Sequence, residues 1–467
     1  MPAVPLPEAF VTRVRHRLGP EADAYLAALG RPPAVGVRLH GAKGVRAPVA
    51  ATPVPWHPRG YTLPARPNFT LDPLLHAGAY YVQEPSSMAV YAALATVQRS
   101  ARPLRILDVC AAPGGKSTLL ADWKRPADLL LANEVVPARR ATLLENLRKW
   151  GAPGCYVGGT AAEDLPGRGQ WDVVLVDAPC SGEGMFRRDA FAREQWSPRL
   201  VAECAALQRT VLTQAAATLA PGGTLIFSTC TGAPEENVGN AGQLLRDRRD
   251  LSEMPLPALA DAGWRREGVG YQALPHRLAG EGLYLSCLRK DGVPPDEPLR
   301  HLRRTRRDHE CETALKQTAD LQLADGLELY RDRDRVTAEY PAHRAFWRTP
   351  HQSGAQPAEA VGAIAAFKGD TAVPTAAMAL ATYLHGDEAA DLSVDRRTAL
   401  RLLGGEAPPE ANAGARGWRR VTYRGVGLTW TKQLGRRYNV AWPKPWRIRQ
   451  RLPPALPGWE IGGEDAP

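Results

Sequence analysis

The middle third of the chain alternates short apolar runs with helical patterns. Four runs of strand length occur, at residues 104–108, 129–134, 171–177 and 224–228. Helices are expected between them, over residues 116–124, 137–150 and 199–219. Gly151 and the Pro-Gly-Gly of residues 221–223 are suitable stops for the second and third helix. Because a repeated order of strand, helix and strand is typical of a parallel sheet covered on both faces, we predict a doubly wound α/β core.

The ends of these predicted strands carry polar side chains. Asp108, Glu134 and Asp177 each close a strand, and Ser228 stands just ahead of Cys230. In doubly wound sheets, ligands bind beyond the carboxyl ends of the parallel strands. The sequence therefore predicts a functional site at this edge of the sheet.

Charge and cysteine usage narrow the classes of partner. The formal net charge is +10 and the pI is near 9.4, which fits a polyanionic partner such as nucleic acid. Seven cysteines without a C-x-x-C pair argue against a disulfide framework, and we expect no metal site. The N-terminus lacks a signal-peptide pattern, and no apolar run approaches the ~20 residues that span a membrane. We expect a cytoplasmic, reducing environment.

Composition divides the chain into four parts. Residues 1–75 are expected to form an N-terminal α+β module, with helices over 8–30 and a strand at 35–39. Residues 76–292 would be the core domain and residues 293–402 an intermediate domain, which begins near a basic run at 300–307. Residues 403–467 are rich in basic and aromatic side chains. Such side chains suit RNA, although tryptophans of a small β-domain can equally form its core.

The loop after the first predicted strand reads Asp-Val-Cys-Ala-Ala-Pro-Gly-Gly-Lys-Ser from Asp108 to Ser117. Small residues allow a ligand to approach the backbone, and a helix N-terminus binds anionic groups. A P-loop would require a glycine where this chain has Cys110. A nucleoside cofactor without a triphosphate fits better. Glu134 lies about 20 residues beyond the last glycine, where a carboxylate holds a ribose diol in doubly wound folds.

Two further strand ends carry cysteines. The third run continues as Asp-Ala-Pro-Cys-Ser-Gly-Glu-Gly from Asp177, and the fourth as Ser-Thr-Cys-Thr up to Thr231. A single cysteine at a strand end is usually a small core residue. Two cysteines, Cys180 and Cys230, at the same predicted sheet edge favour a functional role.

Together these motifs resemble the Sun-type family of RNA (cytosine-5) methyltransferases. The similarity covers roughly residues 5–290 and includes flanking segments at residues 80–88 and 275–282. Residues 427–446 look like the C-terminal region of the bacterial RsmF (YebU-like) branch, which modifies small-subunit ribosomal RNA. The resemblance implies a Rossmann-like S-adenosylmethionine methyltransferase core, with a PUA-like RNA-binding region at the C-terminus.

The resemblance also implies roles for individual residues. The nucleophile that attacks C6 of cytosine would be Cys230, and Cys180 would help to resolve the covalent adduct. Asp177 would lie between cofactor and base, and Glu134 would bind the ribose hydroxyls of S-adenosylmethionine. The methionine part of the cofactor would be held by Cys110, Ala111, Ala112, Pro113, Gly114, Gly115 and Lys116. A carboxylate often holds the adenine amino group in this family; here Asp164 or a backbone group would do so.

These considerations predict methylation of cytosine C5 in 16S ribosomal RNA by a monomer that acts on 16S rRNA or on the small ribosomal subunit. The alternatives are another cytosine-5 methyltransferase, acting on tRNA or DNA, and a non-catalytic ribosome-assembly factor. DNA enzymes typically take their nucleophile from a Pro-Cys loop, here Pro179-Cys180. Arg187 and Arg188 are candidate phosphate contacts.

Overall fold

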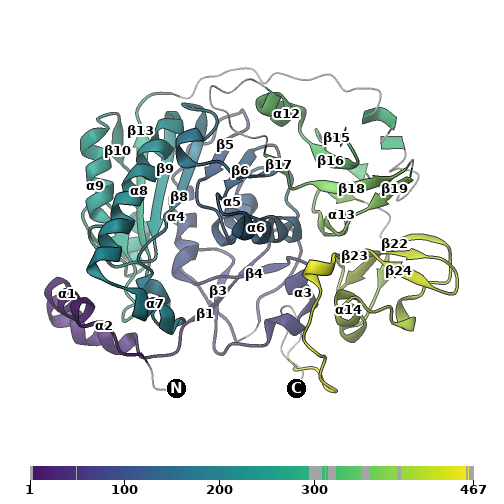
Figure 1. The fold of residues 1–467 in the computed structure, drawn as a ribbon, viewed down its shortest axis with the longest axis horizontal. Coiled ribbons are helices and arrows are strands. Elements are labelled where there is room, and N and C mark those ends of the chain that lie inside the picture. The colour runs from purple at the N-terminus through teal and green to yellow at the C-terminus, as the bar shows by residue number, and fades with distance from the viewer. Residues whose placement is uncertain are drawn as a thin grey trace.

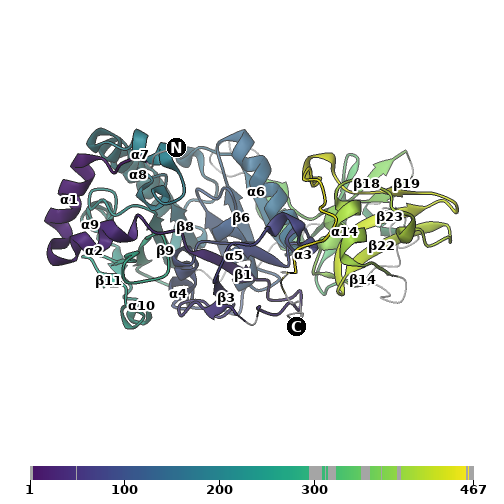
Figure 2. The ribbon, with the colours of Figure 1, turned by 90° about the horizontal axis from the view of Figure 1, so that it is seen from below.

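The computed structural model describes residues 4–48, 50–293, 308–310, 312–313, 322–348, 358–369, 371–385, 391–458 and 461. The basic run at 300–307 and Cys311 lie outside these residues. A large central sheet occupies the middle of the molecule, as Figure 1 shows. The N-terminal helices and the C-terminal sheets lie at opposite ends of it (Figure 2).

The central sheet has ten strands and a parallel core. Its order is β11-β12-β13-β9-β8-β5-β6-β7-β17, with β10 paired to β13. The parallel strands are β5 (Arg105–Asp108), β6 (Leu129–Asn133), β7 (Cys155–Gly158), β8 (Trp171–Asp177) and β9 (Leu219–Thr229). The remaining strands are β10 (Leu251–Glu253), β11 (Arg265–Arg266), β12 (Tyr271–Gln272), β13 (Tyr284–Lys290) and β17 (Glu359–Ala360). The strand order reverses between β5 and β8, which is where doubly wound sheets bind ligands.

Helices cover both faces of this sheet, as predicted. Along β8, Val173 and Leu175 pack on one face, whereas Val174 and Val176 pack on the other. The first face is covered by α4 (Val90–Leu94), α5 (Gly115–Trp123) and α6 (Pro137–Trp150), and the second by α8 (Pro198–Thr218) and α9 (Val238–Asp247). Shorter elements of this region are η4 (Ala162–Asp164), η5 (Glu183–Met185), α7 (Ala190–Gln195) and α10 (Pro257–Asp261).

The expected stop of the third helix is wrong in detail. Helix α8 ends at Thr218, and the Pro-Gly-Gly of residues 221–223 lies inside the long strand β9. The strand shifts register between Trp171 and Val173 of its neighbour, so the irregular segment is accommodated within the sheet. Gly151 does end α6, with the positive φ of 75° that favours glycine there.

The N-terminal part combines helices with a small antiparallel sheet of order β2-β3-β1-β4. The predicted boundary after residue 75 separates β4 from the rest of this sheet, although β4 pairs with β1. Its helices are α1 (Glu8–Leu18), η1 (Gly19–Glu21), α2 (Ala22–Ala28), η2 (Phe69–Leu71), α3 (Pro73–His76) and η3 (Ser86–Ala89). Its strands are β1 (Val35–Leu39), β2 (Thr52–Pro53), β3 (Gly60–Leu63) and β4 (Tyr80–Val82).

One buried arginine joins this small sheet to the core domain. Arg38 of β1 is fully buried, and burial lowers its pKa to about 10. It donates hydrogen bonds to the carbonyl of Gly115 (3.2 Å) and the hydroxyl of Thr118 (2.6 Å), both in the first turns of α5. Its guanidinium also lies over the ring of Trp150, 4.6 Å from the centroid. The N-terminal sheet therefore supports the helix that follows the glycine-rich loop.

The C-terminal part contains three small sheets, of order β14-β20, β15-β16-β18-β19 and β21-β22-β23-β24. Its strands are β14 (Gln322–Leu323), β15 (Glu328–Asp332), β16 (Arg335–Glu339), β18 (Ala363–Lys368), β19 (Thr371–Pro374), β20 (Leu384–His385), β21 (Leu392–Ser393), β22 (Gly417–Tyr423), β23 (Val426–Gln433) and β24 (Tyr438–Val440). Its helices are α12 (Pro341–Arg348), α13 (Ala376–Leu380), α14 (Arg396–Leu403), η7 (Pro409–Ala411) and η8 (Lys444–Trp446). Strand β17 lies between β16 and β18 in the sequence, but it pairs antiparallel with β7 at the edge of the central sheet.

The tryptophans of the last sheet and of the segment that follows it divide between core and surface, as expected. Trp430 and Trp442 are buried, whereas Trp418 and Trp446 are partly exposed. Lysine side chains lie over both partly exposed rings, Lys432 over Trp418 and Lys149 over Trp446. A PUA-like character of this region stays a prediction.

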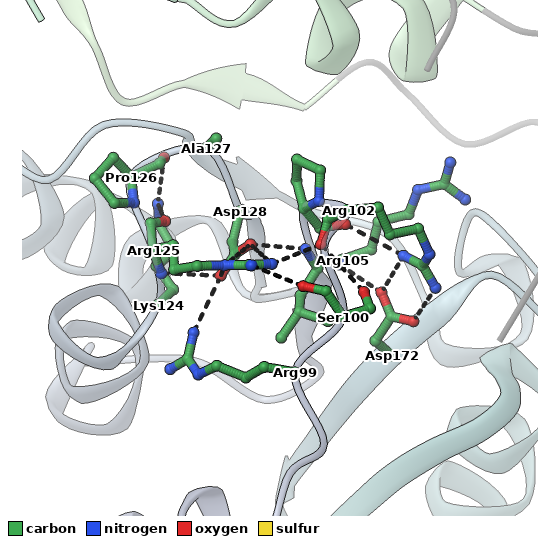
Figure 3. Close-up of polar contacts among 12 residues, drawn as sticks. Arg99, Ser100, Arg102, Arg105, Lys124, Arg125, Pro126, Ala127, Asp128 and Asp172 are labelled. Atoms are coloured by element: carbon green, nitrogen blue, oxygen red, sulfur yellow. Dashed lines mark hydrogen bonds and ion pairs between the residues drawn. The ribbon is translucent and has the colours of Figure 1, made fainter. Parts of the chain in front are cut away.

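The amino ends of the parallel strands are tied together by arginines and two carboxylates, shown in Figure 3. Asp128, fully buried before β6, accepts hydrogen bonds from the backbone of Leu104 (2.7 Å) and from the backbone and side chain of Arg125. Asp172 of β8 accepts two hydrogen bonds from Arg102, at 2.6 and 2.9 Å. This network fixes the sheet at the edge opposite the predicted site.

Candidate active site

A cavity of about 630 Å³ opens at the carboxyl ends of β5, β6, β8 and β9. The predicted residues Cys110, Ala112, Glu134, Asp177, Cys180 and Cys230 all line it. The structure thus brings together side chains from four strand ends that lie far apart in the sequence. The volume is in the range of small-molecule sites in proteins, about 300–1,000 Å³.

The glycine-rich loop between β5 and α5 forms one wall. Gly114 has a φ of 112°, which side chains rarely tolerate, so glycine is required at this turn. Of the predicted loop residues, Cys110 and Ala112 line the cavity, whereas Ala111, Pro113, Gly114 and Gly115 shape the turn behind it. The backbone of Ala111 donates to the carbonyl of Asn133 (2.9 Å), and Asn146 donates to the carbonyl of Pro113 (2.8 Å).

Buried Asp108 anchors this loop from below. Ser117 donates a 2.7 Å hydrogen bond to its carboxylate. Burial raises the pKa of Asp108 to about 7, against the opposing effect of the Ser117 hydrogen bond. At neutral pH this carboxyl group therefore lies close to its titration midpoint.

Lys116, in the first turn of α5, does not itself line the cavity, but it pairs with Asp177, which does. Its ammonium nitrogen lies 2.7 Å from the Asp177 carboxylate, whose other oxygen accepts a 2.8 Å hydrogen bond from Ser228. Burial acts to lower the pKa of Lys116, but the Asp177 carboxylate outweighs it, so the pKa is raised above its ordinary value. The charge of a Cys230 thiolate acts in the same direction. The lysine therefore stays a cation beside the two cysteine loops.

Glu134 follows β6 directly and is almost fully buried in the cavity wall. One carboxylate oxygen accepts a 2.9 Å hydrogen bond from the backbone of Val136, and the other lies 3.4 Å from Arg139. Asn133, which sequence reasoning missed, also lines the cavity and donates to the carbonyls of Val109 (3.2 Å) and Thr160 (2.9 Å). The position of this amide at the end of β6, next to Glu134, could have indicated that Asn133 belongs to the site.

A carboxylate of η4 lines the cavity. It belongs to Glu163, whereas Asp164, expected as an alternative to a backbone group, is absent from the lining; both side chains are exposed. Both residues lie in a single short turn, so sequence position alone does not say which side chain faces inward.

The two cysteines meet at the centre of the site. The sulfur atoms of Cys180 and Cys230 are 3.2 Å apart, although they follow different strands. The hydrogen bond with Cys230 raises the pKa of the Cys180 thiol, and burial raises it further. Gly184 donates from its backbone to the carbonyl of Cys230 (2.6 Å), and a Cβ at Gly184 would approach that carbonyl oxygen to 2.7 Å. This glycine is therefore needed for the close approach of the two loops.

Two adjacent buried residues, Glu236 and Asn237, hold these loops in place. The Glu236 carboxylate accepts hydrogen bonds from the backbone and hydroxyl of Ser181, next to Cys180. Asn237 accepts a hydrogen bond from Thr229 (2.5 Å) and donates one to the carbonyl of Thr231 (2.9 Å), so it contacts both neighbours of Cys230. The Pro-Glu-Glu-Asn segment at 234–237 was visible in the sequence, but its role depends on contacts that sequence reasoning missed.

A second buried carboxylate links the site to the N-terminal helices. Glu183 accepts hydrogen bonds from the backbone of Gly232 (2.9 Å) and from the indole of Trp196 (3.0 Å). It also pairs with Arg13 of α1. The loop after Cys230 is therefore braced by the N-terminal part of the chain.

The sequence suggested Arg187 as a phosphate contact, but the structure buries this side chain in an ion pair. Its side chain is only 6% exposed and donates to Glu281 at 2.6 Å. Arg188 is 32% exposed and remains at the surface beside the same carboxylate, 3.7 Å away. Glu281 is distant in the sequence, so this pairing was not predictable from the motif.

In the part of the chain that the structure describes, no group of three or more His, Cys, Asp or Glu side chains could hold a metal ion. None of the helices described combines the length and apolar character needed to cross a membrane.

Known proteins share the fold of this chain and are similar to it over two segments of the sequence. A methyltransferase homolog protein from Pyrococcus horikoshii superposes with a TM-score of 0.51 at 24% identity, covering 62% of this chain and 96% of that one. The fold, with its switch point between β5 and β8, is the Rossmann-like fold of methyltransferases. Residues 95–289 match the model of 16S rRNA methyltransferase RsmB/F, and residues 6–85 match the N-terminal domain of 16S rRNA methyltransferase RsmF. Over these two segments the chain is similar to the RsmB/F family.

Curated relatives agree with the family models. The chain is 36% identical over 312 residues to a ribosomal RNA small subunit methyltransferase F of Cronobacter sakazakii, and 34% identical over 319 residues to that of Escherichia coli. The matched stretch covers 62% of this chain and 64% or 65% of the relatives, which is just under two thirds of their length.

Proposed function

We propose that this protein transfers a methyl group from S-adenosylmethionine to C5 of a cytosine in 16S ribosomal RNA, with Cys230 as the nucleophile. The observation that carries the proposal is the pair of thiols 3.2 Å apart, in a cavity that Glu134 and Asp177 also line. Asp177 is in turn paired with Lys116. The family and its curated relatives, which are named for small-subunit ribosomal RNA, support the choice of substrate. Such a substrate would place its work in the cytoplasm.

The cavity residues fit the proposed cofactor. Glu134 is held with one carboxylate oxygen toward the exposed cation Arg139, in a position suited to a ribose diol. The small side chains of Cys110 and Ala112 leave room for the methionine part, and Glu163 is suited to the adenine end. When bound, S-adenosylmethionine supplies an electrophilic methyl group on a sulfonium. Glu134, Cys110 and Ala112 would hold this cofactor in the cavity that Cys180 and Cys230 also line.

The chemistry explains why a thiol is needed. C5 of cytosine is a weak nucleophile, and addition of the Cys230 thiolate to C6 makes C5 electron-rich enough to attack a methyl group. A cation stabilises a thiolate, and Lys116 is close enough to Cys230 for their charges to interact. Asp177, between Lys116 and Ser228, is placed to bind the ring-nitrogen edge of the base and to support charge that develops there.

Release of the product requires a second group. After methylation, the proton on C5 must leave before the bond between Cys230 and C6 can break. The proximity of the Cys180 sulfur, 3.2 Å from that of Cys230, supports a part for Cys180 in this step. We assign the resolving role to Cys180.

The two cysteine roles are tested by trapping. With transcribed 16S rRNA or isolated small subunits and S-adenosylmethionine, Cys180→Ala should accumulate a covalent protein–RNA adduct. Cys230→Ala should form no adduct and transfer no methyl group. The opposite pattern would assign the attack to the Pro-Cys loop, as in DNA cytosine enzymes, and contradict the proposal. Absence of methyl transfer by the unaltered protein to any RNA would support a non-catalytic assembly factor.

A further inference from the structure

Exposed apolar side chains gather around the opening of the cavity. Within the described part of the chain, the large apolar side chains that are exposed are Val135, Val136, Met185, Phe191, Leu207 and Val293. Four of them, Val135, Val136, Met185 and Leu207, also line the cavity, and between 41% and 52% of each is exposed. We call these four residues the apolar collar. Their partial exposure places them where the cavity meets solvent.

The collar comes from three separate elements. Val135 and Val136 form the turn between β6 and α6, whereas Met185 ends η5 and Leu207 lies on α8. Apolar surface on separate segments is not explained by the packing of a single helix or strand. A contiguous apolar patch at the surface of a folded protein usually marks a binding site.

Arginines accompany each segment of the collar. Arg139 follows Val136, lines the cavity and has a side chain that is 56% exposed. Arg188 follows Met185 and is 32% exposed, and Arg209 follows Leu207 on the exposed side of α8. Apolar side chains beside cations complement a single-stranded nucleic acid, whose bases present apolar faces and whose phosphates are anionic.

We propose that the collar binds the RNA bases on either side of the nucleotide whose own base enters the cavity. This inference rests on the proposed function, because it takes the base in the cavity to be the target. A base that leaves its stack deprives both neighbours of a stacking partner. Apolar side chains such as methionine, leucine and valine can replace that contact, as wedge residues do at unstacked steps. The collar would therefore hold the RNA open while the target base is bound.

Binding of short RNAs tests the collar without requiring methyl transfer. The probe is a fluorescein-labelled single-stranded RNA of 11 nucleotides with one central cytidine. A second probe has abasic sites on both sides of that cytidine. The unaltered protein should bind the abasic probe roughly three- to tenfold more weakly, because the neighbouring bases no longer contact the collar. The variant Met185→Ser/Leu207→Ser should bind both probes equally, at the weaker level.

A matched control separates this effect from a general loss of apolar surface. Val293 is 83% exposed and does not line the cavity, so Val293→Ser should retain the difference between the two probes. S-adenosylmethionine binding, measured by calorimetry, should be the same in Val293→Ser as in the unaltered protein. Equal binding of both probes by the unaltered protein would overturn the inference, and would leave a protein partner as the remaining use of the collar. Because no step depends on catalysis, the result is independent of whether Cys230 is the nucleophile.

Discussion

The sulfur atoms of Cys180 and Cys230 lie 3.2 Å apart although 50 residues separate them in the sequence. Their contact raises the pKa of the Cys180 thiol, because ionising Cys180 would remove a hydrogen bond and place negative charge beside the other sulfur. Replacing Cys230 by alanine should therefore lower the pKa of Cys180 and raise its rate of alkylation by iodoacetamide at pH 8 several-fold. Mass spectrometry of the modified peptide measures this rate. An unchanged rate would show that burial alone keeps Cys180 protonated.

Asn237 should control the spacing of the two thiols. Asn237→Ala removes contacts to Thr229 and Thr231, both neighbours of Cys230, and should lower kcat more than it raises KM. The rate of Cys180–Cys230 disulfide formation with diamide, which depends on thiol spacing, should fall as well. We expect a loss of stability of about 1–3 kcal/mol. Asn237→Asp keeps the acceptor for Thr229 and should recover part of both rates; a variant that only loses stability would contradict this role.

The residues that line the cavity predict the order in which three substitutions weaken cofactor binding. Glu134→Gln should weaken S-adenosylmethionine binding by about tenfold or more, because it removes a buried anionic acceptor. Glu163→Gln should weaken it less, since this side chain is exposed to solvent. Asp164→Asn is the matched control and should bind like the unaltered protein. Calorimetric titration gives all three affinities, and a larger effect at Asp164 than at Glu163 would refute the assignment of the adenine end.

Asp108 should make stability depend on pH in an unusual direction. Its pKa is raised to about 7 in the folded state, whereas an unfolded aspartate titrates near 3.9. Between about pH 4 and 7 the folded state holds a proton that the unfolded state has lost, so this group stabilises the fold at low pH. That contribution declines as the pH rises toward 7. Urea unfolding of Asp108→Asn across this range should show a flatter or rising profile relative to the unaltered protein; parallel profiles would exclude the effect.

Asp128, at the opposite edge of the sheet, should affect stability and not the site. Asp128→Asn should lower the free energy of unfolding by about 2 kcal/mol, because the carboxylate is buried and accepts several hydrogen bonds. Asp250→Asn is the control: its pair with Arg248 is partly exposed, and such pairs contribute about 0–1 kcal/mol. Denaturant unfolding measures both variants, and equal losses would contradict the structural role of the network in Figure 3.

The local pattern predicted the core well because each segment carries its own signal. Strand β8 was predicted at its observed bounds, as was helix α6, whose end is marked by Gly151. The meeting of Glu134, Asp177, Cys180 and Cys230 followed from a general property of parallel sheets, since their carboxyl ends share one edge.

The failures involve contacts between distant segments. Arg187 is buried by Glu281, which follows it by 94 residues, and nothing near Arg187 indicates that partner. That Glu163 lines the cavity and Asp164 does not depends on the direction of η4. Glu236 and Asn237 look like ordinary polar loop residues until the cysteine loops are placed around them. Long-range pairing of this kind requires the three-dimensional fold.

The pairing of β17 with β7 has a consequence for folding during translation. Residues of β7 emerge about 200 residues before their partner at Glu359 and Ala360. During that interval the nascent sheet presents an open strand edge, which is a template for pairing with another chain. Strand β17 therefore covers the open edge of a sheet whose other strands are synthesised earlier. Chains truncated before residue 359 should be prone to aggregate.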